Sequence, residues 1–211
     1  MKKRLFAVVL SLSAVALAFG QSSFDKAQEL FLQNMPQEAV AQLEIAIADD
    51  PSNVVAFLYL GIAYEQLEML NEAVTVYRQA LGKAGDLKAN VANNLANVFF
   101  KQGNAEDAQA MYTQAISADG GFAPAYLGRA NSRLQSGKLK EALGDYEQYM
   151  ELEPDSAQGA SITQLISLVR TEVSGQHETD AEQAARLARI EAERQRLAAE
   201  EMAKRPALNR P

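Results

Sequence analysis

The side chains whose type and spacing best suit a chemical role are asparagines in the run KANVANNLANVF, residues 88–99. Asn90, Asn93 and Asn97 are spaced by three and four residues, which places them on one face of a helix. A side-chain amide carries both a donor and an acceptor, so such a row can hold a peptide backbone. Two interpretations stay open: an amide row that binds a peptide, and ordinary surface asparagines.

Other reactive side chains are scarce. His177 is the only histidine, the chain has no cysteine, and no clustered carboxylates accompany His177 to complete a metal site. The phosphate-binding patterns G-x-x-x-x-G-K-[ST] and G-x-G-x-x-G are absent. The acidic pair Asp49 and Asp50 falls at an expected helix end and is interpreted as surface charge. We therefore expect no catalytic residue, no metal, no cofactor and no enzymatic activity.

The sequence repeats with a period of 34 or 35 residues, and this repeat places the asparagines on the expected helices. Four alanines carry it, each followed four residues later by a larger side chain: Ala39 and Leu43, Ala73 and Tyr77, Ala108 and Tyr112, Ala142 and Tyr146. Small residues let antiparallel helices approach closely, and large ones one turn away fill the space beside them. A fixed period of this length predicts stacked helix pairs that bury their apolar surfaces against their neighbours.

The expected helix breaks follow the same period. Asn34, Glu68, Gly103 and Gly137 each lie five residues before a repeat alanine. Glycine and asparagine tolerate the left-handed backbone that ends a helix, whereas glutamate does not. The sequence therefore predicts a tighter or strained turn at Glu68.

The segment FLYLGIAYEQLEMLNEAVTVYRQAL, residues 57–81, resembles a tetratricopeptide repeat. The matching residues are Phe57, Leu60, Gly61, Tyr64, Ala73, Tyr77 and Ala80. Four repeats are expected within residues 21–156, at 20–53, 54–88, 89–122 and 123–156. The resemblance implies an all-α fold, a right-handed superhelical stack of antiparallel helix pairs with a concave groove. Residues 157–174 carry an apolar stripe at helical spacing and are expected to form a capping helix over the last repeat.

The resemblance also implies which residues line the groove. In tetratricopeptide repeats, ligand contacts typically come from the second, fifth, ninth, twelfth and thirteenth positions, which we call the groove positions. The candidates are Leu58, Ile62, Glu65, Asn90, Asn93, Asn97, Lys101, Asn131 and Gln135. Leu58 and Ile62 would take side chains of a peptide, and the asparagines would take its backbone. The carboxylate clamp of chaperone-binding repeats is not supported, because only Asn94 fits it.

Two arginines in the fourth repeat replace residues that are usually apolar or aromatic. Arg129 and Arg133 could form an anion site, but the repeat resembles tetratricopeptide repeats that combine such an arginine with the motif ALxDY, here ALGDY, and this resemblance favours a structural ion pair between Arg129 and Asp145. A half-buried pair of this kind destabilises the fold mainly when one partner is removed.

Residues 175–211 are expected to form a linker and a charged helix over about 179–205, which begins with the capping box TDAE. Leu187, Ile190 and Leu197 suggest a coiled-coil seam, but Arg194 and Glu201 occupy the next seam positions. Two interpretations stay open: a solvated or loosely docked helix, and a helix for a partner or for self-association through residues 179–205.

A signal peptide is expected at residues 1–20. The basic run MKKR precedes the 15-residue apolar run LFAVVLSLSAVALAF, and small residues occupy positions 18 and 20 before Gln21. That run is short for a membrane span, which needs roughly 20 residues. Cleavage after Gly20 would export the protein to the periplasm, and without cysteine no bacterial lipid anchor is expected. Cleavage would also take the net charge from −7, by three units, to −10, which argues against nucleic-acid binding.

The sequence therefore predicts a non-enzymatic scaffold or adaptor of the bacterial cell envelope that binds a protein or peptide segment in its concave groove. One alternative is a periplasmic small-ligand or transporter-accessory protein, which a closed apolar cavity between groove and tail would favour. Another is an assembly subunit that acts through its C-terminal helix, which self-association lost on truncation at residue 175 would favour.

Overall fold

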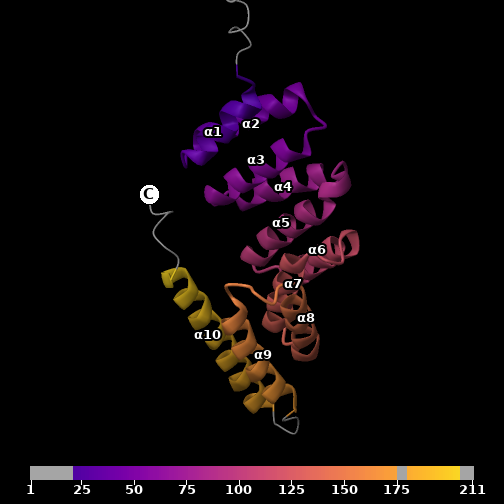
Figure 1. Cartoon of the computed structure of the whole chain (residues 1–211), viewed down its shortest axis with the longest axis vertical. Helices are drawn as coiled ribbons and strands as arrows, with labels where there is room; N and C mark the ends of the chain where they lie inside the picture. The colour runs from indigo at the N-terminus through magenta and orange to yellow at the C-terminus, as the bar shows by residue number, and fades with distance from the viewer. Residues whose placement is uncertain (1–20, 175–179, 205–211) are drawn as a thin grey trace, which may run out of the picture.

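The computed structural model describes residues 21–174 and 180–204, and the described part consists of helices and their connections (Figure 1). The expected signal peptide, His177 and most of the expected linker lie outside the described residues. Four helix pairs follow one another: α1 (Ser23–Leu32) with α2 (Pro36–Asp49), α3 (Val54–Gln66) with α4 (Leu70–Leu81), α5 (Lys88–Lys101) with α6 (Ala105–Ala118), and α7 (Ala123–Gln135) with α8 (Leu139–Leu152). The 3₁₀ turn η1 (Gly85–Leu87) precedes α5, and α9 (Gly159–Ser174) and α10 (Asp180–Lys204) follow the pairs.

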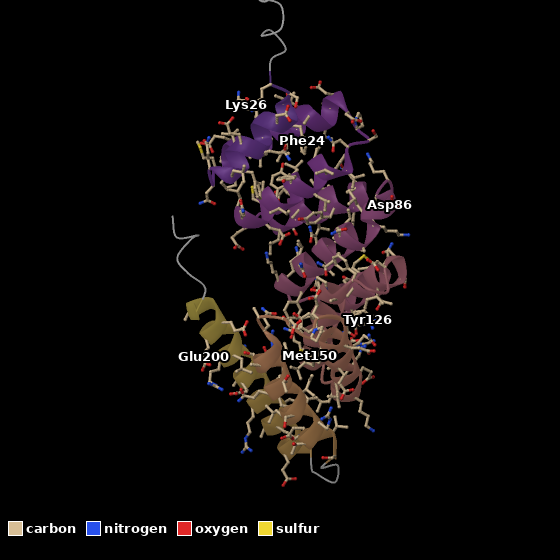
Figure 2. The ribbon with its side chains drawn as sticks, in the orientation of Figure 1. Phe24, Lys26, Asp86, Tyr126, Met150 and Glu200 are labelled. Atoms are coloured by element: carbon tan, nitrogen blue, oxygen red, sulfur yellow. The ribbon has the colours of Figure 1, made fainter. Side chains whose placement is uncertain are left out.

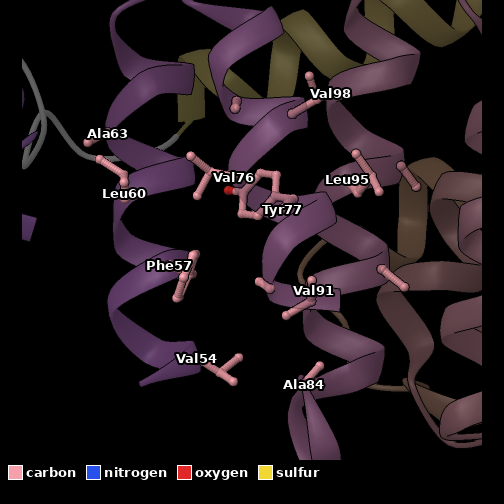
Figure 3. Packing of buried hydrophobic residues seen from close by; sticks show 14 of the residues in the cluster. Val54, Phe57, Leu60, Ala63, Val76, Tyr77, Ala84, Val91, Leu95 and Val98 are labelled. Carbon is pink, nitrogen blue, oxygen red and sulfur yellow. The ribbon is translucent and has the colours of Figure 1, made fainter. Parts of the chain in front are cut away.

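The residues that define the period form the centre of the stack. Each of the four repeat alanines is fully buried, and Tyr77 and Tyr146 are fully buried beside them. Figure 3 shows Tyr77 at the centre of the apolar side chains between α3 and α5. A Cβ atom added to Gly61 would lie 2.3 Å from the Tyr77 ring, so only glycine lets α3 approach the ring this closely. The predicted stack of helix pairs is therefore confirmed.

The turns between paired helices repeat as well. Asn34, Glu68, Gly103 and Gly137 all have positive φ angles, of 57°, 57°, 80° and 73°. Glu68 is exposed and adopts the left-handed conformation despite its side chain. The prediction of a strained turn at this residue is confirmed.

The buried apolar side chains form two clusters. The first runs from Ala27 to Ala125, and the second from Ala123 to Ile190. The second cluster joins the last helix pair to α9 and α10, which lie side by side in Figure 1. None of the helices in the described ranges is long and apolar enough to cross a membrane.

Candidate binding groove

The groove positions of the first two repeats carry half-exposed apolar side chains. Leu58 and Ile62 on α3 are half-buried and pack along the edge of the first cluster. Phe24 and Phe31 of α1 pack against Tyr59 of the same helix α3, with ring centroids 5.8 and 5.1 Å from that of Tyr59, each in an edge-on arrangement. In Figure 2, Phe24 lies on the inner side of α1, whereas Lys26 points away from it.

We call this surface the N-terminal face and define it by Phe24, Phe31, Leu32, Leu58 and Ile62. Leu32 is 88% exposed, the highest value among the exposed large apolar side chains of the described residues. The three residues on α1 were missed by the sequence-based selection. The repeat period could have identified them, because Phe24 lies 34 residues before Leu58 and Phe31 lies 34 residues before Glu65, and both later residues are candidate groove positions.

Glu65 and Lys101 form a bridge between neighbouring repeats. Lys101 Nζ lies 2.5 Å from Glu65 Oε2, and the Tyr77 hydroxyl donates to Glu65 Oε1 at 2.9 Å. Burial, followed by the Glu65 charge, raises the pKa of Tyr77 well above its ordinary value, so the hydroxyl keeps its proton and remains a donor. Both carboxylate oxygens of Glu65 are therefore engaged, and one side chain joins α3, α4 and α5.

Asn97 and Asn131 each accept a hydrogen bond from a tyrosine of the second helix in the same repeat. The Tyr112 hydroxyl donates to Asn97 Oδ1, and the Tyr146 hydroxyl donates to Asn131 Oδ1, each at 2.7 Å. Ile62 occupies the equivalent position one repeat earlier, and there the hydroxyl of Tyr77 turns to Glu65 instead. The two asparagines thus help to fix the pairing of helices, and their amide nitrogens remain as donors toward a ligand.

The three remaining candidate amide side chains differ in their exposure to solvent. Asn90 and Gln135 are exposed near the ends of α5 and α7, whereas Asn93 is only 8% exposed. The Oδ1 atom of Asn93 accepts no hydrogen bond from any described residue. The expected row of exposed amides is therefore present only in part, because the packing around α5 covers its middle member. Binding of a peptide backbone by these amides stays a prediction.

The predicted ion pair between Arg129 and Asp145 is present. Arg129 donates to both carboxylate oxygens of Asp145, with Nε–Oδ2 and Nη2–Oδ1 distances of 2.9 and 2.7 Å. Arg133 adds a third contact, from Nη1 to Oδ2 at 2.6 Å. Asp145 is only 5% exposed. Because both guanidinium groups are directed at this carboxylate, the alternative of an open anion site is not favoured.

The C-terminal part of the groove is covered by α10. The guanidinium of Arg194 lies 5.7 Å from the ring centroid of Phe100, a groove position of the third repeat. Ile190 is fully buried and Leu197 is 6% exposed, so the apolar stripe of α10 faces its own chain. The helix is docked on its own chain rather than solvated, so the first interpretation, a solvated or loosely docked helix, is met in its docked form. Self-association through residues 179–205 stays a prediction.

A small hollow of about 130 Å³ remains where α7, α9 and α10 meet. Its lining mixes apolar and polar side chains, including Leu127, Asn131, Leu197 and Glu201. Small-molecule sites usually measure about 300–1,000 Å³. This hollow therefore gives little support to the small-ligand alternative. Among the described residues, no group of three or more histidine and acidic side chains could hold a metal ion.

Two family models described as tetratricopeptide repeat match the chain, one at residues 63–120 and the other at 24–87 and 93–157. The chain belongs to the tetratricopeptide repeat family. A probable UDP-N-acetylglucosamine–peptide N-acetylglucosaminyltransferase SPINDLY of Hordeum vulgare is 30% identical over 100 residues, 44% of this chain. Protein FlbA of Caulobacter vibrioides is 29% identical over 131 residues, 62% of this chain. The chain spans only 11% and 22% of the lengths of these relatives.

Solved structures share the repeat architecture. The crystal structure of MamA covers 82% of this chain and 96% of its own, with a TM-score of 0.62 and 17% identity. YrrB, described as a TPR protein with an unusual peptide-binding site, covers 85% and 90%, with a TM-score of 0.61 and 20% identity. The first TPR of Spaghetti (RPAP3), bound to the HSP90 peptide SRMEEVD, covers 60% and 97%, with a TM-score of 0.54 and 21% identity. At these identities the likeness establishes the tetratricopeptide repeat fold.

Proposed function

We propose that this protein is a non-enzymatic scaffold that binds a peptide or protein segment through the N-terminal face of its groove. The observation that carries the proposal is the exposure of Leu32 and the partial exposure of Phe24, Phe31, Leu58 and Ile62 at groove positions of two adjacent repeats. Aromatic and aliphatic side chains that are half-exposed on a rigid scaffold lose apolar surface to water when a partner covers them.

The structural relatives support this assignment. YrrB is described as having a peptide-binding site, and the RPAP3 domain holds a peptide. The similarity to the transferase gives no reason to assign its activity to this chain, because the chain spans only 11% of that protein. A partner with apolar side chains would fit Leu58 and Ile62, and the amide nitrogen of Asn97, which donates to no described residue, is suited to donate to its backbone.

The place of action that we propose is the bacterial periplasm. The basic, apolar and small-residue segments within residues 1–20 support export, with cleavage after Gly20. Cell fractionation and mass spectrometry of the N-terminus test this part directly. A mature chain that begins at Gln21 in the periplasmic fraction is expected, and an uncleaved chain in the cytoplasm would contradict it.

The binding function is tested by capture of partners from envelope extract, with the captured proteins identified by mass spectrometry. The doubly substituted Leu58→Glu/Ile62→Glu protein is compared with wild type, because two carboxylates would have to be desolvated under any apolar partner. Ile45→Glu is the matched control, since Ile45 is 47% exposed but lies on α2, away from the groove positions.

A partner retained by wild type and by the control, and lost by the double variant, is the expected result. Its direct binding is then measured with purified components. Equal capture by all three proteins, with unchanged helical content, would remove the N-terminal face as the binding surface.

A further inference from the structure

The C-terminal half of the groove is occupied by the chain itself. Phe100, Leu127 and Asn131 hold groove positions of the third and fourth repeats, and each lies against α10 or the hollow beside it. We call these three residues the C-terminal face. In the first two repeats the equivalent positions carry the open N-terminal face. One groove is thus divided into an open half and a half that a helix fills.

The side of α10 turned toward the repeats has a definite pattern. Leu187 and Ile190 belong to the second apolar cluster, Arg194 lies over Phe100, and Leu197 is buried beside Leu127. These positions follow the spacing apolar-x2-apolar-x3-Arg-x2-apolar, alternating three and four residues as in a heptad seam. Arg194 interrupts the apolar seam; its guanidinium donates to Glu191 on the same helix, with Nε–Oε2 and Nη2–Oε1 distances of 2.9 and 2.5 Å, and lies over the Phe100 ring.

The attachment of α10 is modest. Among its described side chains only Ile190 and Leu197 are buried, whereas α9 buries Gly159, Ile162, Leu165, Ile166 and Val169. Leu187 packs at the edge of the apolar cluster, and three polar contacts join α10 to α9: Ser161 with Glu201 at 2.9 Å, Gln164 with Glu193 at 3.1 Å, and Glu172 with Arg186 at 2.9 Å. Glu200 lies on the outer side of α10 (Figure 2). Water competes for the exposed contact between Gln164 and Glu193, which therefore holds the helix weakly, whereas the other two contacts are partly buried.

We propose that the C-terminal face is a helix-binding site that α10 of the same chain occupies in the absence of a partner. The partner that replaces α10 is an amphipathic helix that presents an arginine between apolar residues. A helix of this pattern on another protein meets the same ring, the same aliphatic side chains and the same amide. Binding requires release of α10, so the resident helix lowers the apparent affinity for the partner. The inference rests on the proposed function, because both place binding in the groove, but it concerns a different half of it.

The test uses the full chain and a synthetic peptide with the sequence of residues 180–204, labelled with a fluorophore. Ile190→Glu/Leu197→Glu in the full chain removes the two buried anchors of the resident helix. Fluorescence anisotropy is expected to show the peptide binding this released protein at least about tenfold more tightly than wild type, since competition within the chain is gone. Ala192→Glu, on an exposed position of α10, is the matched control and is expected to behave as wild type.

Two further substitutions locate the site. A peptide in which Arg194 is replaced by alanine is expected to bind the released protein at least about two- to fivefold more weakly, because that is the range of an exposed cation–π contact and the Arg194 side chain is only 20% exposed. Adding Leu58→Glu to the released protein is expected to leave peptide binding unchanged, because Leu58 belongs to the other half. Failure of the N-terminal face to bind a partner would therefore leave this result intact, and the two proposals can fail separately.

Three results would overturn the inference. One is absence of peptide binding to a released protein whose circular dichroism shows the repeats intact. Another is loss of that binding with Leu58→Glu. The third comes from hydrogen exchange of the wild-type protein, in which backbone amides of α10 are expected to exchange faster than those of α9. Equal protection of the two helices would mean that α10 does not leave the groove independently.

Discussion

Replacing Gly61 with alanine should damage the fold at the point where the repeat pattern is tightest. The added Cβ would lie 2.3, 2.4 and 2.8 Å from the Cε1, Cζ and Cδ1 atoms of Tyr77. Real carbon atoms do not approach so closely, so the ring or the helix must move. The Tyr77 ring is fully buried and its hydroxyl donates to Glu65, so a displaced ring loses this hydrogen bond.

The magnitude follows from three contributions. Overpacking of a close-packed core costs about 1–3 kcal/mol. A hydrogen bond to a charged group contributes about 1.5–3 kcal/mol, part of which is lost. Alanine gains about 1 kcal/mol over glycine in a helix interior. The net loss should therefore be about 2–4 kcal/mol, or roughly 5–15 °C in melting temperature for a chain of this size.

Gly144→Ala makes the same chemical change on α8 and provides the control. A Cβ at Gly144 would meet nothing within 4 Å, and the residue is exposed within the helix. This substitution should raise stability by up to about 1 kcal/mol. Urea denaturation followed by circular dichroism measures both free energies of unfolding. The reasoning is refuted if Gly61→Ala lies within about 0.5 kcal/mol of wild type, or if both substitutions change stability in the same direction.

Three further predictions concern charge, backbone strain and pH. Asp145→Ala should cost about 3–5 kcal/mol in urea denaturation, because it leaves two half-buried arginines without their carboxylate; a loss below about 1 kcal/mol would show that they find other partners. Glu68→Gly should stabilise the fold by about 0.5–1 kcal/mol by relieving a positive φ of 57°, and a lower melting temperature would contradict this. Burial raises the pKa values of Tyr77, Tyr112 and Tyr146 above the ordinary 10.0, so above about pH 10 the unfolded chain loses protons that the folded chain keeps. These groups should leave the free energy of unfolding unchanged below pH 10 and should lower it above pH 10 by up to about 1.4 kcal/mol per pH unit for each tyrosine. Because the chain has no tryptophan, tyrosinate absorbance reports the titration of the tyrosines. Ionisation of all tyrosines before the protein unfolds would exclude the effect.

The fold was predictable because its determinants are local and repeated. Ala73 and Tyr77 mark one helix, and the same types recur at one period, so a single pattern locates four helix pairs. Glu68 was recognisable as strained because its neighbours in the period are glycine or asparagine. The pairing of Arg129 with Asp145 followed from the resemblance to tetratricopeptide repeats that combine an arginine at this position with the ALxDY motif.

The division of the groove was not predictable in this way, because it depends on contacts between repeats and tail. Arg194 breaks an apolar seam when α10 is considered alone, and only the docked helix brings it to Phe100. The burial of Asn93 likewise depends on how closely successive repeats pack, which the helical period of one segment does not specify. The tyrosine–asparagine bonds had a sequence signal, because Asn97 and Asn131 each lie 15 residues before their tyrosine.

The two halves of the groove meet at neighbouring residues, and this has a consequence for any long partner. Lys101, which bridges to Glu65, directly follows Phe100, which α10 covers. A segment confined to the first two repeats needs no movement of α10, whereas one that continues past Lys101 must displace it. Ile190→Glu/Leu197→Glu should therefore leave the affinity for a short partner unchanged and raise the affinity for a long one. Isothermal titration with partner fragments of increasing length distinguishes the two cases, and an equal effect on all fragments would mean that the halves are not separate.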